Sequence, residues 1–327
     1  MRLVMMGTGT FAEPTFEALL AAFGGNVVGL VTQPERDGSN KRGSTRQTGK
    51  GMASIAAAAG VAVAQPESIN TPEGLAALRE MRPDLLVVAA YGQILSKDVL
   101  GVPTRGTINI HGSLLPKFRG AAPVAYAILN GERQTGVTII KVTPGLDSGD
   151  MILQETIDIA VDDTTGSLEA KLAIVGATLS VEAVRLYESG NPVEGRKQDP
   201  TLVTKAPKFK KEFGLIDWTK PAEAICHHVR AMQPWPTAYT FLHRPGKEPM
   251  RVIVSRATVA DRGSLGQPPG VIMCDMPARG RLQVAAASGL FVEVLELQIA
   301  GKKRMTAAEF SNGYGFCDER FGPEVLA

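Results

Sequence analysis

The chain has 327 residues, of which 44% are hydrophobic and 21% are charged. This balance is typical of a globular protein of two domains, and no apolar run approaches the roughly 20 residues that span a bilayer. The first residues lack the features of a signal peptide, and the three cysteines are far apart. We therefore expect a cytoplasmic protein without membrane association, disulfide framework or bound metal.

The formal net charge of +2 is unevenly distributed, because 16 basic residues stand against 12 acidic residues from position 208 onward. A mildly basic C-terminal part permits contact with nucleic acid. An ordinary solvated surface explains the same charge equally well.

The first predicted elements begin an α/β sheet. Residues 2–6 predict a strand, residues 7–12 a tight turn, and the apolar stripe that follows predicts a helix. The turn fits the Gly-x-Gly-x-x-Ala pattern of dinucleotide sites. However, the second strand, 27–32, ends in Gln-Pro instead of the acidic residue that holds a ribose. The turn serves either close strand–helix packing or a dinucleotide, and we favour packing.

A long basic loop over residues 33–51 follows the second strand. Connections of this length are uncommon unless they are functional or disordered. Interspersed cations on a Gly/Ser-rich segment suit a phosphate backbone, and a merely solvated loop is the alternative. The cations of this loop are Arg36, Lys41, Arg42, Arg46 and Lys50.

Two apolar segments further along predict buried strands. Residues 84–89 form a continuous apolar run, which is typical of a strand buried on both faces. Residues 107–111, Thr-Ile-Asn-Ile-His, predict a second strand in which Asn109 and His111 share one face. They would lie at its carboxyl end, where open α/β sheets bind ligands. An amide beside an imidazole can polarise a carbonyl and move a proton, although a purely structural histidine is the simpler alternative.

The remaining elements complete a two-domain pattern. Helices are predicted at 52–59, 72–81, 122–129 and 164–187, and strands at 61–64, 138–142 and 151–159. Their alternation indicates a doubly wound, largely parallel α/β sheet. The Pro- and Lys-rich residues 191–211 predict a linker between domains at 1–190 and 212–327. In the second domain, short strands alternate with Gly/Pro turns, as in a β-barrel.

One segment carries a recognisable motif. Residues 109–120, Asn-Ile-His-Gly-Ser-Leu-Leu-Pro-Lys-Phe-Arg-Gly, resemble the signature of the folate-dependent formyltransferases. Gly-Val-Thr-Ile at 136–139 and Leu-Asp-Ser-Gly at 146–149 resemble a second segment of that family, at the expected distance. The resemblance extends over almost the whole chain. It implies a Rossmann-like formyltransferase domain followed by a small OB-like β-barrel domain.

The resemblance also implies a reaction and a site. The reaction is formyl transfer from 10-formyltetrahydrofolate to an amine, with Asn109, His111 and Asp147 as catalytic residues and no metal. The folate would bind Val88, Ala89, Ala90, Tyr91, Gly92, Gln93, Ile94 and Leu95, together with Ser113, Leu114, Leu115 and Pro116.

The basic loop suggests the acceptor. Family members that act on methionyl-initiator tRNA carry a basic insertion here against the acceptor arm, so we expect this acceptor and a monomeric enzyme. Their usual Gly-Arg-Gly-Lys-Lys run is replaced by Ser-Asn-Lys-Arg-Gly, which leaves the role of each cation open. The expected phosphate contacts are Arg36, Lys41, Arg42, Arg46, Lys50, Lys208, Lys210 and Lys211.

Three other functions share parts of this pattern. Formylation of another amine, such as an amino-sugar nucleotide, and hydrolysis of the formyl-folate would use the same three catalytic residues. A non-catalytic RNA-binding protein would use only the barrel and the cations. The basic loop favours an RNA acceptor, and the intact set of Asn109, His111 and Asp147 favours an enzyme.

Overall fold

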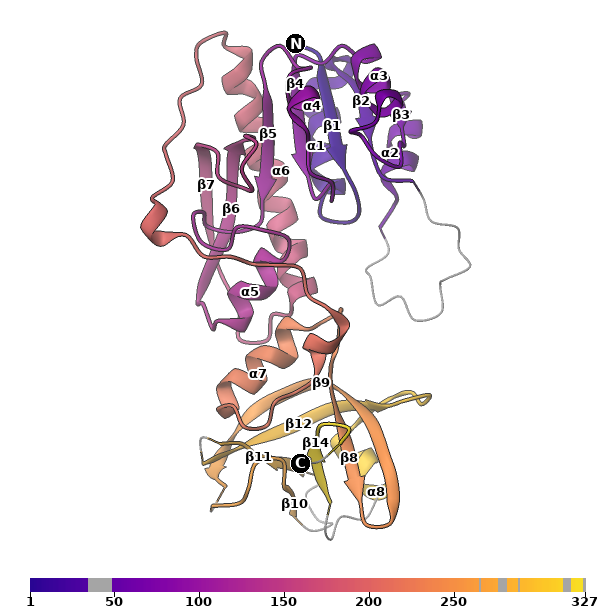
Figure 1. Cartoon of the computed structure of the whole chain (residues 1–327), viewed down its shortest axis with the longest axis vertical. Coiled ribbons are helices and arrows are strands. Elements are labelled where there is room, and N and C mark those ends of the chain that lie inside the picture. The colour runs from indigo at the N-terminus through magenta and orange to yellow at the C-terminus, as the bar shows by residue number, and fades with distance from the viewer. Residues whose placement is uncertain (35–48, 265, 276–280, 288, 314–318, 326–327) are drawn as a thin grey trace. The chain divides into compact units, whose positions relative to one another are not determined.

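The computed structural model describes residues 1–34, 49–264, 266–275, 281–287, 289–313 and 319–325. They form two compact units, and most of the second unit is drawn in the orange to yellow part of the colour range in Figure 1. The first unit comprises Met1–Ala127, Arg133–Ala160 and Gly166–Lys208, and the second comprises Ile128–Glu132, Val161–Thr165 and Phe209–Ala327. Four cations predicted for the basic loop, Arg36, Lys41, Arg42 and Arg46, lie outside the described residues.

The first unit is built on a seven-stranded sheet with the order β3-β2-β1-β4-β5-β6-β7. Strands β1 to β5 are parallel, and β6 and β7 are antiparallel to their neighbours. The strands are β1 (Leu3–Gly7), β2 (Val27–Val31), β3 (Ala62–Ala64), β4 (Leu85–Ala89), β5 (Thr107–His111), β6 (Gln134–Lys141) and β7 (Met151–Asp158). The order reverses between β1 and β4, and such a switch point is where open α/β sheets bind ligands.

Burial explains why these segments form strands. Every residue of β1 and β4 is buried, as expected for apolar runs in the centre of a parallel sheet. The strands are connected by α1 (Glu13–Phe23), α2 (Met52–Ala58), α3 (Pro72–Glu80), α4 (Lys97–Leu100) and α5 (Pro123–Leu129), and β7 is followed by α6 (Thr165–Glu188). Helix α3 begins as its sequence predicts, with Thr71 as N-cap accepting a hydrogen bond from the Gly74 amide and with Pro72 in the first turn.

Residues 191–208 differ from the free linker that their composition predicts, because they belong to the first unit. Arg196 exchanges two backbone hydrogen bonds with Met151 at the start of β7, of 2.9 and 2.8 Å. Further along, the amide of Arg119 donates to the Thr204 carbonyl at 2.9 Å, and the amide of Ala206 donates to the Arg119 carbonyl at 2.7 Å. We call residues 196–206 the strap. Backbone pairing of this kind holds a segment whose own regular structure is limited to the short 3-10 helix Pro200–Leu202.

The second unit contains a seven-stranded antiparallel sheet in the order β10-β11-β12-β9-β8-β14, with β13 paired to β12. Its elements are α7 (Ala222–Ala231), β8 (Ala238–Arg244), β9 (Lys247–Gly263), β10 (Ile272–Asp275), β11 (Arg281–Ala285), β12 (Leu290–Ile299), β13 (Arg304–Thr306), α8 (Ala307–Gly313) and β14 (Arg320–Gly322). The edges meet where Val271 bridges Arg320 and the Phe321 amide donates to Gly270 at 2.8 Å. This closure makes the sheet a barrel.

One strand of the barrel is longer than expected. Strand β9 has 17 residues, whereas the turn-rich sequence predicts short strands. It pairs with β8 through its first half and with β12 through most of its length, with register shifts at three points along β12. Bulges of this type let one long strand bend around a closed sheet.

Candidate active site

The carboxyl end of β5 carries the polar pair that the sequence predicts. Strand β5 has the predicted bounds, Thr107–His111, and its register places Asn109 beside Val88 of β4. Asn109 is partly exposed, and among the described residues its side-chain amide has no hydrogen-bonding partner. His111 is only 5% exposed. The amide of Asn109 is thus available to a ligand, whereas the imidazole of His111 is held within the protein.

Two contacts hold the imidazole of His111. Its Nε2 atom lies 3.0 Å from the carbonyl oxygen of Phe118, and its Nδ1 atom lies 3.7 Å from the Oδ2 atom of Asp147. A carbonyl oxygen only accepts, so Nε2 carries a proton and donates it to this contact. In the neutral ring, Nδ1 is therefore a bare acceptor that faces a carboxylate. A second proton on Nδ1 converts this arrangement into an ion pair, so the pair is suited to holding and releasing a proton.

Asp147 is held from a different part of the chain. Its Oδ2 atom accepts a hydrogen bond of 2.9 Å from the Gly120 amide, and its side chain is 15% exposed. The carboxylate thus contacts the backbone of the signature segment and the imidazole of His111 through one oxygen. The two matching sequence segments, 109–120 and 146–149, are brought together at this point.

Backbone strain is concentrated in the loops around this site. Ala90, Phe118 and Asp147 have positive φ angles of 47°, 63° and 46°. Such angles are uncommon for residues with a side chain and cluster at functional sites, where the surrounding structure holds them. At Phe118 the conformation accompanies the contact between its carbonyl and His111, and at Asp147 it accompanies the contact between the carboxylate and Gly120.

A buried network holds the signature segment against β6 and β7. The Thr138 hydroxyl donates to the Ser113 carbonyl at 2.6 Å and accepts from the Leu115 amide at 3.1 Å. The side-chain amide of Gln154 donates to the Leu115 carbonyl at 3.0 Å and to the Thr138 hydroxyl at 2.9 Å. Sequence reasoning quoted Thr138 only as part of a motif and missed Gln154, which stands in an otherwise ordinary strand.

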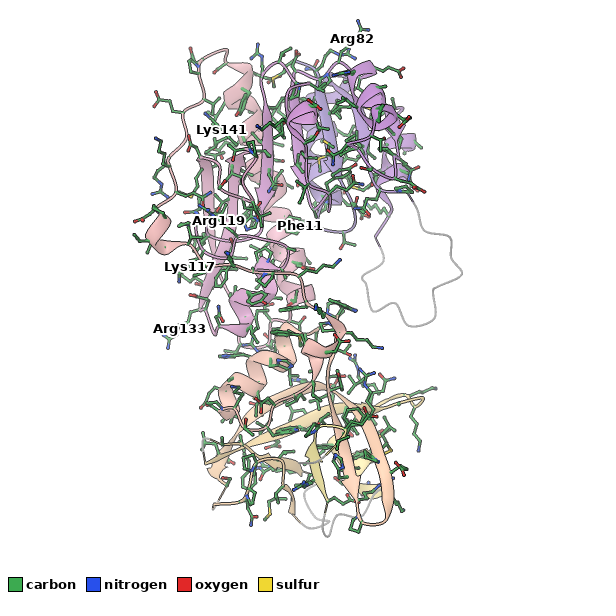
Figure 2. The ribbon with its side chains drawn as sticks, in the orientation of Figure 1. Phe11, Arg82, Lys117, Arg119, Arg133 and Lys141 are labelled. Atoms are coloured by element: carbon green, nitrogen blue, oxygen red, sulfur yellow. The ribbon has the colours of Figure 1, made fainter. Side chains whose placement is uncertain are left out.

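The predicted folate residues of the signature segment contribute mainly to packing. Ser113 is fully buried and donates to the Lys117 carbonyl at 2.7 Å, and Leu115 packs against Ile140 and Met151. Leu114 and Pro116 are partly exposed. Lys117 and Arg119, which continue the segment, lie in the part of the first unit that contains β6 and β7 (Figure 2).

The predicted folate loop after β4 divides into buried and exposed residues. Val88, Ala89 and Tyr91 are buried, Gln93 and Leu95 are half-buried, and Ala90, Gly92 and Ile94 are exposed. Burial raises the pKa of the Tyr91 phenol to about 12, so this group stays neutral. The side chain of Gln93 accepts from the Ile69 amide at 2.9 Å and donates to the Glu67 carbonyl at 3.0 Å. The face open to a ligand therefore consists of backbone groups and Ile94.

The basic loop is tied down at both described ends. The Gln33 side chain donates to the Tyr91 carbonyl at 2.8 Å. At the other end, the carboxylate of Glu13 accepts from the backbone amides of Lys50 and Gly51, both at 3.0 Å, and Glu13 is only 8% exposed. The Lys50 ammonium is paired with Glu17 at 2.6 Å. Lys208, Lys210 and Lys211 are exposed, Lys208 in the first unit and the other two in the second.

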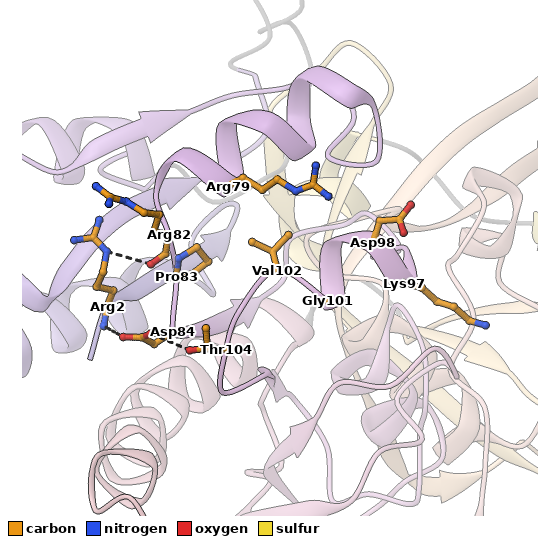
Figure 3. A pocket seen from close by; sticks show the side chains of 10 residues that line it. All are labelled: Arg2, Arg79, Arg82, Pro83, Asp84, Lys97, Asp98, Gly101, Val102 and Thr104. Carbon is orange, nitrogen blue, oxygen red and sulfur yellow. Dashed lines mark hydrogen bonds between the residues drawn. The ribbon is translucent and has the colours of Figure 1, made fainter.

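A surface hollow of about 660 Å³ lies at the end of the sheet opposite to the carboxyl ends of the parallel strands (Figure 3). It is lined by residues that precede β1, β4 and β5, and therefore by the amino ends of these strands. There the Asp84 carboxylate accepts from the Arg2 amide at 2.7 Å and from the Thr104 hydroxyl at 2.9 Å. The side chains of Arg82 and Lys97 extend away from each other (Figure 3). The polar groups of this hollow tie strand ends together and do not converge on a ligand.

No group of three or more His, Cys, Asp or Glu side chains within the described ranges is placed to hold a metal ion. No helix in those same ranges is long and apolar enough to cross a membrane.

Comparison with known proteins covers both units. Residues 1–184 match the Formyl transferase family model, and residues 208–315 match the model of the Formyl transferase C-terminal domain. A methionyl-tRNA formyltransferase of Citrifermentans bemidjiense is 42% identical over 315 residues, which cover 96% of this chain and 94% of that protein. The corresponding protein of Geotalea uraniireducens is also 42% identical, over 96% of this chain and 95% of its own length.

Solved structures share the fold. A sugar 3N-formyl transferase has a TM-score of 0.67 at 16% identity and covers 93% of this chain and 99% of its own. An N-formyltransferase from Helicobacter canadensis has a TM-score of 0.64, also at 16% identity, over 90% of this chain and 98% of its own. The matches over both units, together with the geometry around His111 and Asp147, lead to one conclusion. The chain belongs to the methionyl-tRNA formyltransferase family.

Proposed function

We propose that this protein transfers the formyl group of 10-formyltetrahydrofolate to the free α-amino group of methionyl-initiator tRNA. The observation that carries this proposal is the approach of His111 and Asp147 within the signature segment, at the carboxyl end of β5. Close relatives named methionyl-tRNA formyltransferase support the choice of acceptor.

The reaction requires two kinds of help from the protein. The neutral amine attacks the formyl carbon, and the carbonyl oxygen becomes an oxyanion in the tetrahedral intermediate. The amine nitrogen then loses a proton, the bond from the formyl carbon to N10 of the folate breaks, and N10 takes up a proton. The site must therefore stabilise an oxyanion and relay one proton.

The residues of the site divide these tasks. The amide of Asn109 is partly exposed and, among the described residues, unpartnered, so it donates to the oxyanion. His111 has its Nε2 proton engaged by the Phe118 carbonyl, which leaves Nδ1 and the facing carboxylate of Asp147 to accept and return the proton. The 3.7 Å between these two atoms exceeds the length of a hydrogen bond, and a proton on Nδ1 would turn the contact into an ion pair.

The donor site is proposed at the loop after β4. Its exposed residues Ala90, Gly92 and Ile94 follow directly on the strand that pairs with β5, so a ring bound along this loop lies near Asn109. The backbone there can exchange hydrogen bonds with a flat polar ring, while Tyr91 and Gln93 keep the loop in place from behind. The signature residues Ser113 and Leu115 act by shaping the adjoining segment.

The tRNA acceptor is proposed to bind through its phosphates to cationic side chains. Lys50, Lys208, Lys210 and Lys211 are exposed among the described residues, and the other predicted cations lie outside them. Binding through phosphates should weaken steeply as the salt concentration rises. The monomeric state is part of this proposal, and sedimentation equilibrium tests it.

The testing experiment measures formyl transfer from 10-formyltetrahydrofolate to methionine-charged initiator tRNA, with uncharged tRNA and an amino-sugar nucleotide as parallel acceptors. We expect product only with charged tRNA. Formylation of the amino sugar, or loss of the formyl group to water without an acceptor, would overturn the proposed acceptor and leave the catalytic residues in place. Binding of tRNA without consumption of formyl-folate would overturn the enzymatic proposal.

A further inference from the structure

The side chain of Gln198 joins the two loops of the candidate active site. Its Oε1 atom accepts hydrogen bonds from Nε and Nη2 of Arg119, at 2.9 and 2.8 Å. Its Nε2 atom donates to the carbonyl oxygens of Asp147 and Gly149, both at 2.8 Å. Arg119 belongs to the signature segment, and the two carbonyls belong to the loop that presents the Asp147 carboxylate. Gln198 itself lies in the strap, far from both loops in sequence.

The orientation of this amide is unambiguous. A guanidinium only donates and a carbonyl only accepts, so the oxygen of Gln198 must face Arg119 and the nitrogen must face the two carbonyls. A glutamine amide can accept two hydrogen bonds and donate two. All four are made, with good distances, by a half-buried side chain. A fully satisfied network of this kind restricts the loops that it connects.

The loop around Asp147 needs such a restraint. Asp147 has a φ of 46°, a strained conformation for a residue with a side chain, which persists only where the surrounding structure holds it. Gly120 holds the carboxylate from one side, and Gln198 holds the backbone carbonyl of the same residue from the other. The neighbouring Gly149 packs so closely on the Lys141 carbonyl that a Cβ has no room, so the loop has little freedom on that side as well.

The strap supports Gln198 at both ends. Arg196, two residues before it, pairs with Met151 through two backbone hydrogen bonds. Thr204 and Ala206, after it, pair with the backbone of Arg119. In Figure 1 the strap runs beside β7 and includes one short helical turn, Pro200–Leu202, before the chain continues to the second unit. The glutamine is therefore presented from a segment that is itself fixed to both loops.

We propose that Gln198 is a positioning residue, which sets the Asp147 carboxylate relative to His111 by bridging Arg119 to the backbone of the Asp147 loop. This inference rests on the proposed function, because it takes Asp147 to be a catalytic group. Gln198 touches neither substrate nor reacting atoms and acts only through the loop. Its removal should therefore lower kcat and leave the binding of donor and acceptor nearly unchanged.

The first variant is Gln198→Leu, which keeps the approximate volume and removes all four hydrogen bonds. We expect kcat to fall roughly 10- to 100-fold, with KM for formyl-folate and for charged tRNA changed less than about threefold. The matched control is Asp199→Ala, in the same strap. Among the described residues, the Asp199 side chain accepts only from Thr201, through the backbone amide at 2.9 Å and the hydroxyl at 2.7 Å, so its loss should leave kcat near the wild-type value.

A second variant separates the two halves of the bridge. Gln198→Glu keeps the acceptor for Arg119, strengthened by charge, and places an oxygen against the two carbonyls. If the bond to the Asp147 loop matters, this variant should lose as much kcat as Gln198→Leu, while the charge-strengthened contact to Arg119 keeps the strap in place and circular dichroism shows a folded protein. It also keeps the test decisive if Gln198→Leu does not fold.

A double-mutant cycle gives the final decision. If Gln198 acts through Asp147, then adding Gln198→Leu to Asp147→Ala should cause no further loss of kcat. Losses that multiply in the double variant would show a general structural role and overturn the inference. A wild-type kcat in Gln198→Leu and Gln198→Glu, with a low kcat in Asp147→Ala, would overturn the inference alone. A wild-type kcat in Asp147→Ala would instead overturn the proposed function of Asp147.

Discussion

The Nδ1 atom of His111 lies 3.7 Å from the Oδ2 atom of Asp147, and the same oxygen accepts a hydrogen bond from the Gly120 amide. The end of a strand, a loop between two strands and the signature segment thus meet at one carboxylate.

Removal of the charge on Asp147 should slow the reaction without disturbing the fold. Asparagine tolerates the left-handed conformation at this position, and its side-chain oxygen can still accept from Gly120. We expect Asp147→Asn to lower kcat about 10²–10⁴-fold, because the imidazole loses its anionic partner. Single-turnover kinetics with charged tRNA measure this effect. Asp158→Asn, on exposed β7, is the control, and equal kcat in both variants would contradict the assignment.

Asn109 should act mainly in the transition state. Loss of one donor to an oxyanion costs about 10²–10³ in kcat. We expect Asn109→Ala to show a loss of this size with nearly unchanged KM values, because the amide has no partner among the described residues and its removal leaves no orphaned group. Steady-state kinetics and circular dichroism together test this. A higher KM with wild-type kcat would mean that Asn109 binds the ground state instead.

Glu13 should fix the backbone at the C-terminal end of the basic loop. Its buried carboxylate accepts two backbone hydrogen bonds, from Lys50 and Gly51, whereas Glu17, within the described part of the chain, makes only an exposed ion pair with the Lys50 side chain. Exposed pairs contribute little, but a doubly bonded buried carboxylate fixes the backbone. We expect Glu13→Ala to raise KM for tRNA several-fold and to leave KM for formyl-folate unchanged.

The control for this effect is Glu17→Ala, which should change neither constant by more than about twofold. Both variants should be measured at two salt concentrations, since phosphate contacts weaken with salt. Equal effects of the two substitutions on KM for tRNA would contradict the role of Glu13.

Glu169 should make the stability of the first unit depend on pH. Burial raises the pKa of this carboxyl from 4.5 to about 7, so the folded state holds its proton over a range in which the unfolded state has lost it. The contribution of this group to stability is therefore fully present below pH 4.5, falls as the pH rises, and is lost above about pH 7. We expect Glu169→Gln, which is neutral throughout, to melt several degrees above the wild type at pH 8 and at the same temperature at pH 4. Equal melting temperatures at pH 8 would refute this.

Much of the fold could be predicted because its signals are local. The apolar run at 84–89 and the alternation at 107–111 correctly indicated β4 and β5, and the motif at 109–120 correctly indicated the family. The antiparallel direction of β6 and β7 was not predicted, because an apolar strand pattern does not encode the direction of its neighbour. The strap was not predicted for a related reason. It is held by backbone hydrogen bonds to distant loops, and side-chain composition does not indicate such bonds.

The sequence by itself determined which chemical groups are present. It also determined that Asn109 and His111 lie on the same face of β5, because side chains in a strand alternate with a period of two residues. Only the tertiary structure decided how they are used. The path of the chain leaves Asn109 exposed, turns the Nε2 atom of His111 toward Phe118, and brings Asp147 to its Nδ1 atom. These relations depend on hydrogen bonds between residues far apart in sequence, which exist only once the sheet and the strap have packed.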